Sequence, residues 1–238
     1  MSERLLVTDL GRRAYEEVLE LQRDLCRRRL AGDLADDRLL LVEHDPVVTL
    51  GRGTRASSLP LAPAELAGRG VPVVEVERGG DVTYHGPGQL VGYPILHLGE
   101  HRRDLHWYLR TLEDVLVLAL GRLGVEAERR HGLTGVWTAG RKIASIGIHV
   151  KQWVTYHGFA LNVSTDLTAF DLIVPCGIED VMMTSVAEEL LRSDVQGLGT
   201  EVKAVVIAAF AETFGFARVE HEEAGSGTVR AAPAFPHR

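Results

Sequence analysis

The chain has 238 residues and a formal net charge of −7, and 45% of its residues are hydrophobic. This material can form a substantial core, while the acidic balance argues against a nucleic-acid surface, which normally carries a basic stripe. The two cysteines, Cys26 and Cys176, match neither a metal-site spacing nor a disulfide framework. The beginning of the chain has no apolar signal core, and no apolar run approaches the roughly 18 residues of a membrane span. We therefore expect a cytoplasmic protein with no membrane segment.

The first part of the chain alternates short β runs with one amphipathic helix. The expected strands cover residues 5–10, 39–43, 47–50 and 71–77. The helix is expected over 12–30, where apolar residues recur at helical spacing. Cys26 lies beside that apolar face, so we interpret it as a core thiol without chemistry. The stretch 51–70 is rich in Gly, Ser, Pro and Ala, which predicts a loop with one helical turn at 63–67.

The second part begins with a long helix, which Asp104 is expected to cap and which ends near Gly124. Its leucines, from Leu105 to Leu123, predict a core-facing stripe. A hairpin is expected over 136–150, with its turn at Ala139 and Gly140, then a strand over 156–163 and a helix from Thr200 to Phe214. Strands interrupted irregularly by helices indicate an α+β fold around one mixed sheet. We expect a single domain over 1–220 and a flexible tail over 221–238.

The most informative residue is Cys176, which follows an apolar, strand-like run from Phe170 to Val174. Pro175 biases its neighbour away from helix, and Gly177 permits a sharp turn or a close approach to a ligand. This context is typical of a thiol presented at the end of a strand, although an inert buried thiol is the more common case.

A glycine-rich segment, RGGDVTYHGPGQL, covers residues 78–90. It has no Gly-Lys-Ser/Thr ending and lacks the third glycine of the dinucleotide fingerprint, so a phosphate loop is excluded. Either it is an ordinary hairpin with glycine turns, or it is a pocket wall where glycines leave room for a ligand. In the second case Thr83, Tyr84 and His85 supply oriented polar groups.

Lys142 is expected at the hairpin turn that leads into a strand of small and apolar residues. Most lysines are solvated surface charges. Near a cysteine, however, a lysine either favours the thiolate as an ammonium or serves as a base when neutral. His157 is a second candidate partner for Cys176, in a protease-like pair, although a histidine in a strand is more often structural. No histidines show zinc-site spacing, so we expect no metal.

Together these segments resemble the lipoyl(octanoyl) transferases, which act in lipoate biosynthesis. The matching motifs are RGGDVTYHGPGQLVGYPI at 78–95, GRKIASIGIHV at 140–150, YHGFALNVSTDL at 156–167 and FDLIVPCGI at 170–178. They occur in the family's order and roughly at its spacing, which makes the combination far more specific than any one motif. The resemblance implies an α+β fold like that of the biotin/lipoate protein ligases, which belongs to the class II aminoacyl-tRNA synthetase and biotin synthetase-like group, with a mixed β-sheet flanked by helices.

The resemblance also implies a reaction. Cys176 would carry an octanoyl thioester and Lys142 would tune it. The donor would be octanoyl-acyl carrier protein, and the acceptor a lysine of the lipoyl domains of 2-oxoacid dehydrogenases or of the glycine-cleavage H protein. No ATP and no metal would be needed. The implied substrate-binding residues are Arg78, Gly79, Gly80, Asp81, Val82, Thr83, Tyr84, His85, Ser145, Ile146, Gly147, Gly158, Phe159 and Ala160. The alternatives are an ATP-dependent lipoate–protein ligase, a cysteine hydrolase and a non-catalytic acyl-binding module.

Overall fold

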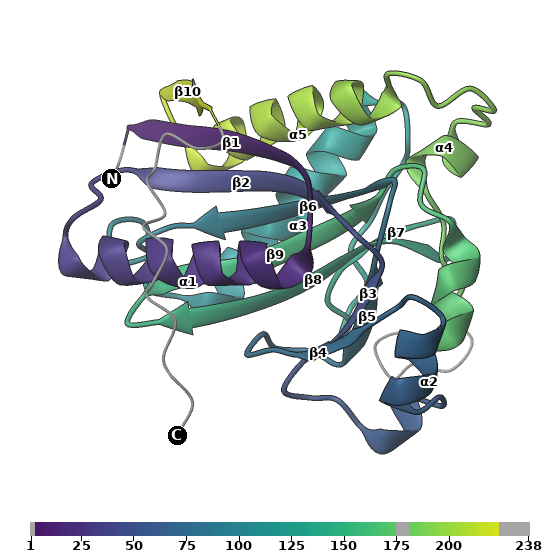
Figure 1. Cartoon of the computed structure of the whole chain (residues 1–238). Helices are drawn as coiled ribbons and strands as arrows, with labels where there is room; N and C mark the ends of the chain where they lie inside the picture. The colour runs from purple at the N-terminus through teal and green to yellow at the C-terminus, as the bar shows by residue number, and fades with distance from the viewer. Residues whose placement is uncertain (1–2, 175–180, 224–238) are drawn as a thin grey trace, which may run out of the picture.

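The computed structural model describes residues 3–174 and 181–223, which surround one large β-sheet (Figure 1). Seven strands form this sheet in the order β10-β1-β2-β6-β9-β8-β7. In that order they cover Arg218–Glu222, Arg4–Arg13, Asp37–His44, Gln89–Ile95, Val154–Asn162, Arg141–Lys151 and Val136–Thr138. β10, β1 and β2 are parallel, and all later pairs are antiparallel. The sheet is therefore mixed, and the predicted α+β class is confirmed.

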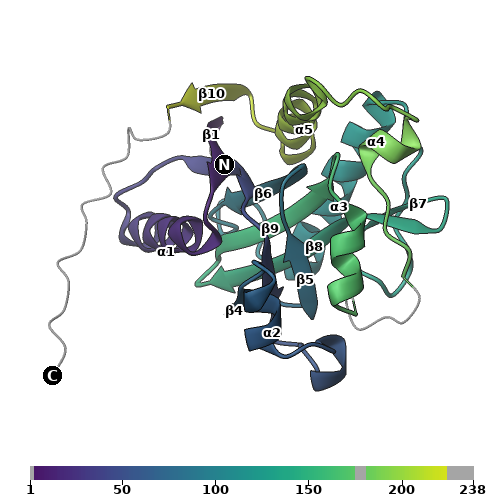
Figure 2. The same cartoon turned by 45° about the vertical axis from the view of Figure 1, so that its right-hand side comes forward.

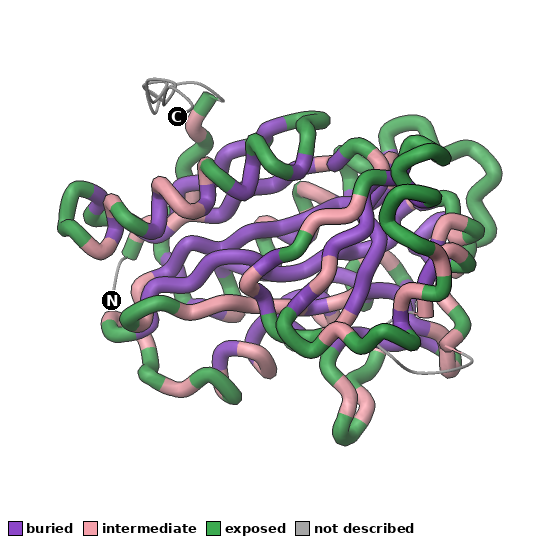
Figure 3. Tube along the Cα trace, turned by 60° about the horizontal axis from the view of Figure 1, so that its bottom comes forward, coloured by how far each residue is buried: buried purple, intermediate pink, exposed green. Residues whose placement is uncertain are grey.

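Helices cover both faces of the large sheet (Figures 1 and 2). α1 (Tyr15–Ala31) lies on one face, while α3 (Leu105–Arg122) and α5 (Leu198–Phe214) lie side by side on the other. Because both faces are covered, β6 and β9 are buried at every position, and the sheet strands form the buried centre of the tube in Figure 3. In the part of the chain that the structure describes, no helix is long and apolar enough to cross a membrane.

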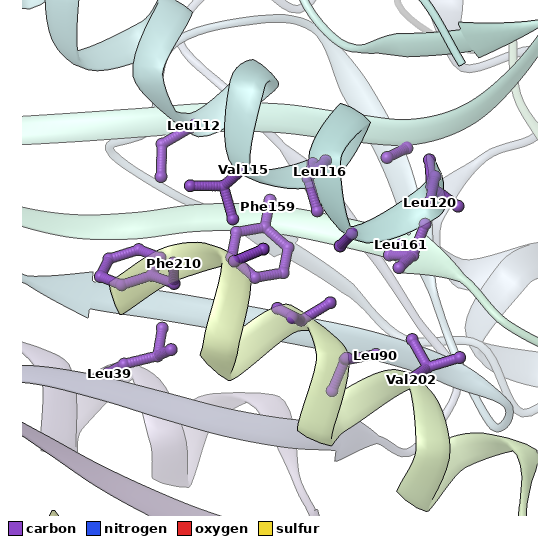
Figure 4. Packing of buried hydrophobic residues seen from close by; sticks show 14 of the residues in the cluster. Leu39, Leu90, Leu112, Val115, Leu116, Leu120, Phe159, Leu161, Val202 and Phe210 are labelled. Atoms are coloured by element: carbon purple, nitrogen blue, oxygen red, sulfur yellow. The ribbon is translucent and has the colours of Figure 1, made fainter. Parts of the chain in front are cut away.

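The larger core cluster lies between the sheet and the pair α3 and α5. Figure 4 shows Phe159 and Leu161 of β9 directed toward Leu116 and Leu120 of α3, with Phe210 of α5 beside them. Asp104 caps α3 as predicted, since its carboxylate accepts a hydrogen bond from the Trp107 N–H at 3.0 Å. The leucine stripe is confirmed at its centre only, because Leu105 is 44% exposed.

A second, smaller sheet stands beside the large one, with strand order β4-β3-β5. These strands cover Val73–Glu75, Val47–Leu50 and Val82–His85. The 3-10 helix η1 (Ala56–Ser58) and helix α2 (Pro63–Gly68) belong to the same region, and α2 confirms the predicted helical turn. This region has its own apolar cluster, which includes Tyr84, Phe170 and Ile173.

Several element boundaries differ from the sequence predictions. The first helix begins at Tyr15, because β1 continues to Arg13, which pairs with His44 of β2. The strand-like run before Cys176 was predicted wrongly, since Leu167–Leu172 forms the 3-10 helix η2. The Asp166 side chain accepts a hydrogen bond from the Thr168 N–H and so begins that helix. A short helix, α4 (Val186–Glu189), precedes α5, which begins after Gly197 and not at Thr200.

The end of the described chain also extends further than expected. β10 continues to Glu222 and pairs in parallel with β1, from Arg4 opposite Arg218 to Thr8 opposite Glu222. The first two residues of the segment predicted as a tail therefore belong to the sheet. Residues 224–238 lie outside the described residues, and the division into a domain and a tail stays a prediction.

Candidate active site

A cavity lies where the small sheet meets the large one, and it contains about 470 Å³ of space between atoms, its open mouth included. Its walls come from the start of α1, the glycine-rich loop and strands β5, β6, β8 and β9. The lining residues are Tyr15, Arg78, Gly80, Asp81, Val82, Thr83, His85, Val91, Tyr93, Ser145, Ile146, Gly147, His157, Gly158, Phe159 and Ala160. Segments far apart in the sequence therefore meet around this one cavity, which is called the slot below.

Small residues on neighbouring strands form the floor of this slot. Ser145 lies opposite Ala160, and Gly147 lies opposite Gly158. The glycines are required by their surroundings: a Cβ on Gly147 would lie 2.9 Å from both Arg78 Cδ and the Gly79 carbonyl oxygen. A Cβ on Gly158 would lie 2.2 Å from a backbone oxygen of β6, which cannot give way. The absence of side chains at these two positions therefore lets the glycine-rich loop approach β8 and lets β6 approach β9 closely.

The glycine-rich loop forms the opposite wall, and Arg78 holds it in place. This buried guanidinium donates to the carbonyl oxygens of Gly79, Asp81 and Thr49, at 3.2, 2.8 and 2.8 Å. The Gly79 N–H donates to the carbonyl oxygen of Ile148 in β8 at 2.9 Å, which joins the loop to the large sheet. Arg78 thus acts on the loop's backbone, in addition to lining the cavity.

A continuous chain of polar side chains runs from Arg78 across the two sheets. Arg78 donates to the Thr49 hydroxyl at 2.9 Å, and that hydroxyl lies 3.5 Å from Nε2 of His85. Nδ1 of His85 lies 2.8 Å from Oε1 of Gln89, and because that oxygen is an acceptor, the proton is on Nδ1. Gln89 donates in turn to Asn162 Oδ1 at 3.0 Å.

The far end of that chain reaches the neighbourhood of Lys142. Asn162 donates to the Thr184 carbonyl oxygen at 3.0 Å, and the Thr184 N–H donates to the Lys142 carbonyl oxygen at 3.0 Å. The wall of the cavity and the backbone of Lys142 therefore belong to one connected network, in which each member fixes the orientation of the next.

Buried tyrosine and histidine rings line part of the cavity, and their burial favours the neutral form of each. Burial raises the pKa of Tyr15 to about 12 and raises that of Tyr93 well above its ordinary value. Burial also lowers the pKa of His157 to about 3, with the nearby Arg78 charge acting in the same direction, and lowers that of His85. Behind them, Nε2 of His44 lies 2.8 Å from the Tyr93 hydroxyl, and burial lowers the pKa of His44 to about 4.

Lys142 lies at the start of β8, outside the cavity lining, and is only 1% exposed. Its Nζ lies 5.5 Å from the centroid of the Trp137 ring, and the Arg130 guanidinium carbon lies 4.8 Å from the same centroid. Gly135 leaves space for its side chain, since a Cβ there would lie 2.9 Å from Lys142 Cε. The prediction of a lysine at a hairpin turn is confirmed in position, but the side chain is buried and does not project into solvent.

Cys176, the predicted nucleophile, lies outside the described residues, as do Pro175 and Gly177. The described residues on either side of it are held by backbone hydrogen bonds. Before it, the Val174 N–H donates to the Ser58 carbonyl oxygen, and the Ser58 hydroxyl donates to Asp81 at 2.7 Å. After it, the Lys142 N–H donates to the Met182 carbonyl oxygen at 2.8 Å. Val174 is thus tied through Ser58 to the glycine-rich loop, and Met182 is tied to Lys142.

The residues predicted for substrate binding all line the cavity except Gly79 and Tyr84. Gly79 joins the loop to β8, and Tyr84 packs against Phe170 in the small sheet's own cluster. The side chains of Ile146 and Phe159 belong to the core on the α3 and α5 face. That these residues contact a substrate stays a prediction.

Four lining residues were not among those predicted for substrate binding: Tyr15, Val91, Tyr93 and His157. Val91 and Tyr93 lie within the 78–95 motif, and His157, which was considered as a partner for Cys176, lies within the 156–167 motif. Tyr15 lies outside every recognised motif. In the described ranges, no three His, Cys, Asp or Glu side chains are grouped so that they could hold a metal ion.

Comparison with known proteins assigns the chain to a family. The family model described as the lipoyl protein ligase A/B catalytic domain matches residues 14–211. The chain therefore belongs to this family of catalytic domains. An octanoyltransferase from Gloeobacter violaceus is 50% identical over 213 residues, which are 89% of this chain and 91% of that protein. One from Nostoc sp. is 46% identical over 215 residues, or 90% and 94% of the two chains. The chain thus belongs among the octanoyltransferases and is an acyltransferase.

Similar solved structures confirm the predicted fold. A putative lipoate protein ligase from T. acidophilum with bound lipoic acid superposes with a TM-score of 0.67, at 18% identity, over 94% of this chain and 89% of that one. A lipoate-protein ligase A bound with ATP gives a TM-score of 0.68 at 19% identity, over the same shares of the two chains. At this identity the likeness establishes the architecture and not the reaction.

Proposed function

We propose that this octanoyltransferase takes its acyl group from octanoyl-acyl carrier protein and transfers it to a lysine of lipoyl domains, through a thioester on Cys176. The observation that carries the proposal is the cavity itself, which small residues of β8 and β9 line and whose glycine-rich wall is tied through Ser58 to Val174, just before the Cys176 segment. From His157 to Ala160 the lining covers three residue steps of β9. At about 3.3 Å per residue this is roughly 10 Å, comparable with an extended eight-carbon chain.

The proposed chemistry consists of two acyl transfers. The Cys176 thiolate attacks the donor carbonyl, the bond from that carbon to the phosphopantetheine sulfur breaks, and the released thiolate takes up a proton. The acceptor lysine then attacks the new thioester. A C–N amide bond forms, the bond to the Cys176 sulfur breaks, and a proton from the amine returns to that thiolate. As an ammonium, Lys142 favours the thiolate form of the cysteine. As a neutral amine, it accepts the proton that passes from the attacking amine to the Cys176 thiolate.

The energetics of these steps call for no ATP and no metal. Exchange of one thioester for another is nearly isoenergetic, and conversion of a thioester to an amide is downhill. The acyl chain is bound mainly by burial: about 0.8 kcal/mol per methylene gives roughly 5 kcal/mol for six methylenes. A reducing compartment such as the cytoplasm, where we place the protein, keeps the thiol free.

A lipoyl domain is the proposed acceptor because of the family to which the chain belongs. One similarly folded system is described as a bipartite lipoate protein ligase and its E2 lipoyl domain from Thermoplasma acidophilum. The H protein of glycine cleavage is a second proposed acceptor. The choice of acyl carrier protein as donor rests on the sequence motifs and on the thioester chemistry, which needs an activated acyl group when no nucleotide is used.

Intact-protein mass spectrometry tests the proposal. The enzyme is mixed with octanoyl-acyl carrier protein in the absence of an acceptor. We expect an octanoyl adduct that hydroxylamine removes, that a lipoyl domain discharges and that is missing in Cys176→Ser. Active enzyme that shows no adduct on rapid quenching would rule out the thioester. ATP-dependent transfer of free octanoate by Cys176→Ser would instead support a ligase, and free octanoate released without an acceptor would support a hydrolase.

A further inference from the structure

Helix α3, which the structure describes in full, carries one charged side chain among its buried residues, that of Glu113. Glu113 is 1% exposed, whereas the other buried side chains of this helix are apolar or carry a hydroxyl group. A buried carboxylate is costly unless cations and hydrogen bonds compensate its charge. No step of the proposed reaction uses this carboxylate, so its burial calls for another reason.

Glu113 has two hydrogen-bond partners among the described residues. Its Oε1 accepts from the Gly135 N–H at 3.0 Å, and its Oε2 accepts from Nη1 of Arg110 at 2.6 Å. Arg110 lies one turn earlier on α3 and is 41% exposed, so solvent screens part of its charge. This half-exposed cation therefore compensates the buried carboxylate only in part.

Gly135 connects the carboxylate to Lys142. The φ of Gly135 is 128°, and a Cβ there would lie 2.9 Å from Lys142 Cε and 3.4 Å from Nζ. The backbone of Gly135 is thus the wall against which the end of the lysine side chain packs. Because this one residue separates the two groups, standard bond lengths place the Glu113 carboxylate within about 9 Å of Nζ.

The contact with Gly135 does not by itself explain a glutamate. The amide oxygen of a glutamine would accept the same N–H without burying a charge. The charge therefore has a role of its own. On the other side of Gly135 lies Lys142, which is also 1% exposed. Opposite charges that are both withdrawn from water stabilise each other far more than an exposed pair does.

We propose that Glu113 is a positioning residue for the reaction. It holds the Gly135 wall beside the Lys142 side chain, and its negative charge keeps the amine protonated in the resting enzyme. The inference rests on the proposed function, in which the Lys142 ammonium favours the Cys176 thiolate. It adds a residue of the core helix α3 to a site whose predicted members lie on strands and loops.

Other charged groups surround Lys142 as well. Arg130 approaches the same Trp137 ring and, as a like charge, disfavours the ammonium. The remaining charged side chains on the neighbouring described segments are bound to one another or to a hydroxyl group: Glu128 to Arg130 at 4.0 Å, Glu189 to Arg141 at 2.9 Å, and Glu188 to Thr184 at 3.1 Å. The effect of Glu113 is therefore exerted against one nearby cation.

The pH dependence of adduct formation tests the proposal. The single-turnover rate is measured for the full-length enzyme with octanoyl-acyl carrier protein, and it should fall at alkaline pH, where the ammonium is lost. In Glu113→Gln the amide still accepts from Gly135 and only the charge is removed. The ammonium is then less stable, so the alkaline limb of the profile should move to lower pH. Unit charges about 9 Å apart at an effective dielectric constant of about 20 give a shift of about one pH unit, or about a tenfold lower rate on that limb.

Two further variants serve as controls. Asp114→Asn removes the same unit charge from the next residue of α3, but Asp114 and its partner Arg129 are both exposed. Solvent screens this pair, so the profile should not move. Glu113→Asp keeps the charge but shortens the reach to Gly135, and its alkaline limb should stay at the wild-type pH. A purely structural role predicts the reverse, with Glu113→Gln like wild type and Glu113→Asp impaired.

Each outcome decides. Absence of adduct formation by the wild type would refute the proposed function and this inference with it. Normal wild-type transfer with the alkaline limb at the same pH in Glu113→Gln would overturn the role of Glu113 alone.

Stability decides if Glu113→Gln does not fold. Adding Lys142→Met should then restore folding, because removal of both members of a buried pair costs much less than removal of one. A double variant that stays unfolded while Lys142→Met alone folds would show that Glu113 acts only on packing, and would overturn the proposal.

Discussion

The Nζ atom of Lys142 lies 5.5 Å from the centroid of the Trp137 ring, within the range of a cation–π interaction. Trp137 is only 2% exposed, so the ring face is a desolvated surface for the ammonium group. We expect Trp137→Leu to lower the rate of octanoyl transfer about tenfold, since such an interaction is worth roughly 0.5–2 kcal/mol. The loss should disappear when Lys142 is already replaced by Met; an equal loss in that background would show that Trp137 acts only on packing.

Lys142→Met should leave a folded protein with greatly reduced activity. Met fills the space of the buried stem, whereas Lys142→Ala leaves a cavity in addition to removing the amine. We expect the transfer rate to fall about 100-fold or more, the usual size of a lost acid–base group. The measurement is the single-turnover rate of adduct formation, with thermal unfolding as the control. A rate near that of wild type would remove Lys142 from the mechanism.

The two cysteines provide a matched pair of substitutions. Cys26 is 3% exposed on α1, and burial raises the pKa of its thiol, which suppresses the thiolate. Cys26→Ser should therefore retain near-normal turnover, with a modest loss of stability because a hydroxyl is buried among apolar side chains. Cys176→Ser should abolish turnover. Equal loss of activity in the two folded variants would contradict the assignment of the chemistry to Cys176.

A methyl group in the floor of the slot should have a large effect. In Gly158→Ala the new Cβ would meet the Gly92 carbonyl oxygen at 2.2 Å, so we expect a loss of several kcal/mol in unfolding free energy. Gly121→Ala is the control, because a Cβ at this position in the last turn of α3 has no neighbour within 4 Å. That variant should be unchanged or up to about 1 kcal/mol more stable. Chemical denaturation of both variants measures the difference.

Stability should fall as the pH falls below about 6.5. Unfolded histidines titrate near pH 6.5, whereas burial lowers the pKa of folded His44 to about 4. Between these values the unfolded chain binds a proton that the folded chain does not, so unfolding becomes easier with acidification. For His44 the loss reaches about 3 kcal/mol at 1.36 kcal/mol per pKa unit.

Urea unfolding at several pH values checks this pH dependence. His44→Gln should reduce the slope of unfolding free energy against pH by about one proton between pH 6.5 and 4. His131→Gln, at an exposed position, should leave it unchanged. Identical slopes in both variants would show that the acid sensitivity arises elsewhere.

Local patterns in the sequence predicted most of the elements but not their assembly. Apolar spacing and the Asp104 cap correctly indicated α3, and Ala139 and Gly140 correctly marked the turn between β7 and β8. The 3-10 helix before Cys176 was missed because its apolar residues suit a strand equally well. The neighbours in the large sheet depend on pairings between distant strands, such as β2 with β6, which no local pattern contains.

In the candidate site, too, local sequence patterns were predictive and tertiary packing was not. Most of its motif residues were predicted because they form contiguous runs. Tyr15, outside the motifs, and Tyr93, near the end of one, were not predicted, since each looks like an ordinary core aromatic and reaches the cavity only through tertiary packing. Tyr84 lies outside the cavity lining, and strand alternation gives the reason: its neighbours Thr83 and His85 line the cavity, while Tyr84 packs on Phe170.

The parallel pairing of β1 with β10 has a consequence for synthesis. β1 emerges from the ribosome long before β10, and its outer edge is covered only when Arg218–Glu222 has been made. Until then the nascent chain presents the unpaired backbone N–H and C=O groups of this edge to other strands. Leu5 and Val7, which are buried in the folded chain, lie on the same strand. Shielding by a chaperone or rapid release should matter more for this protein than for one whose edge strands are neighbours in sequence. A chain truncated before residue 218 would keep that edge open permanently.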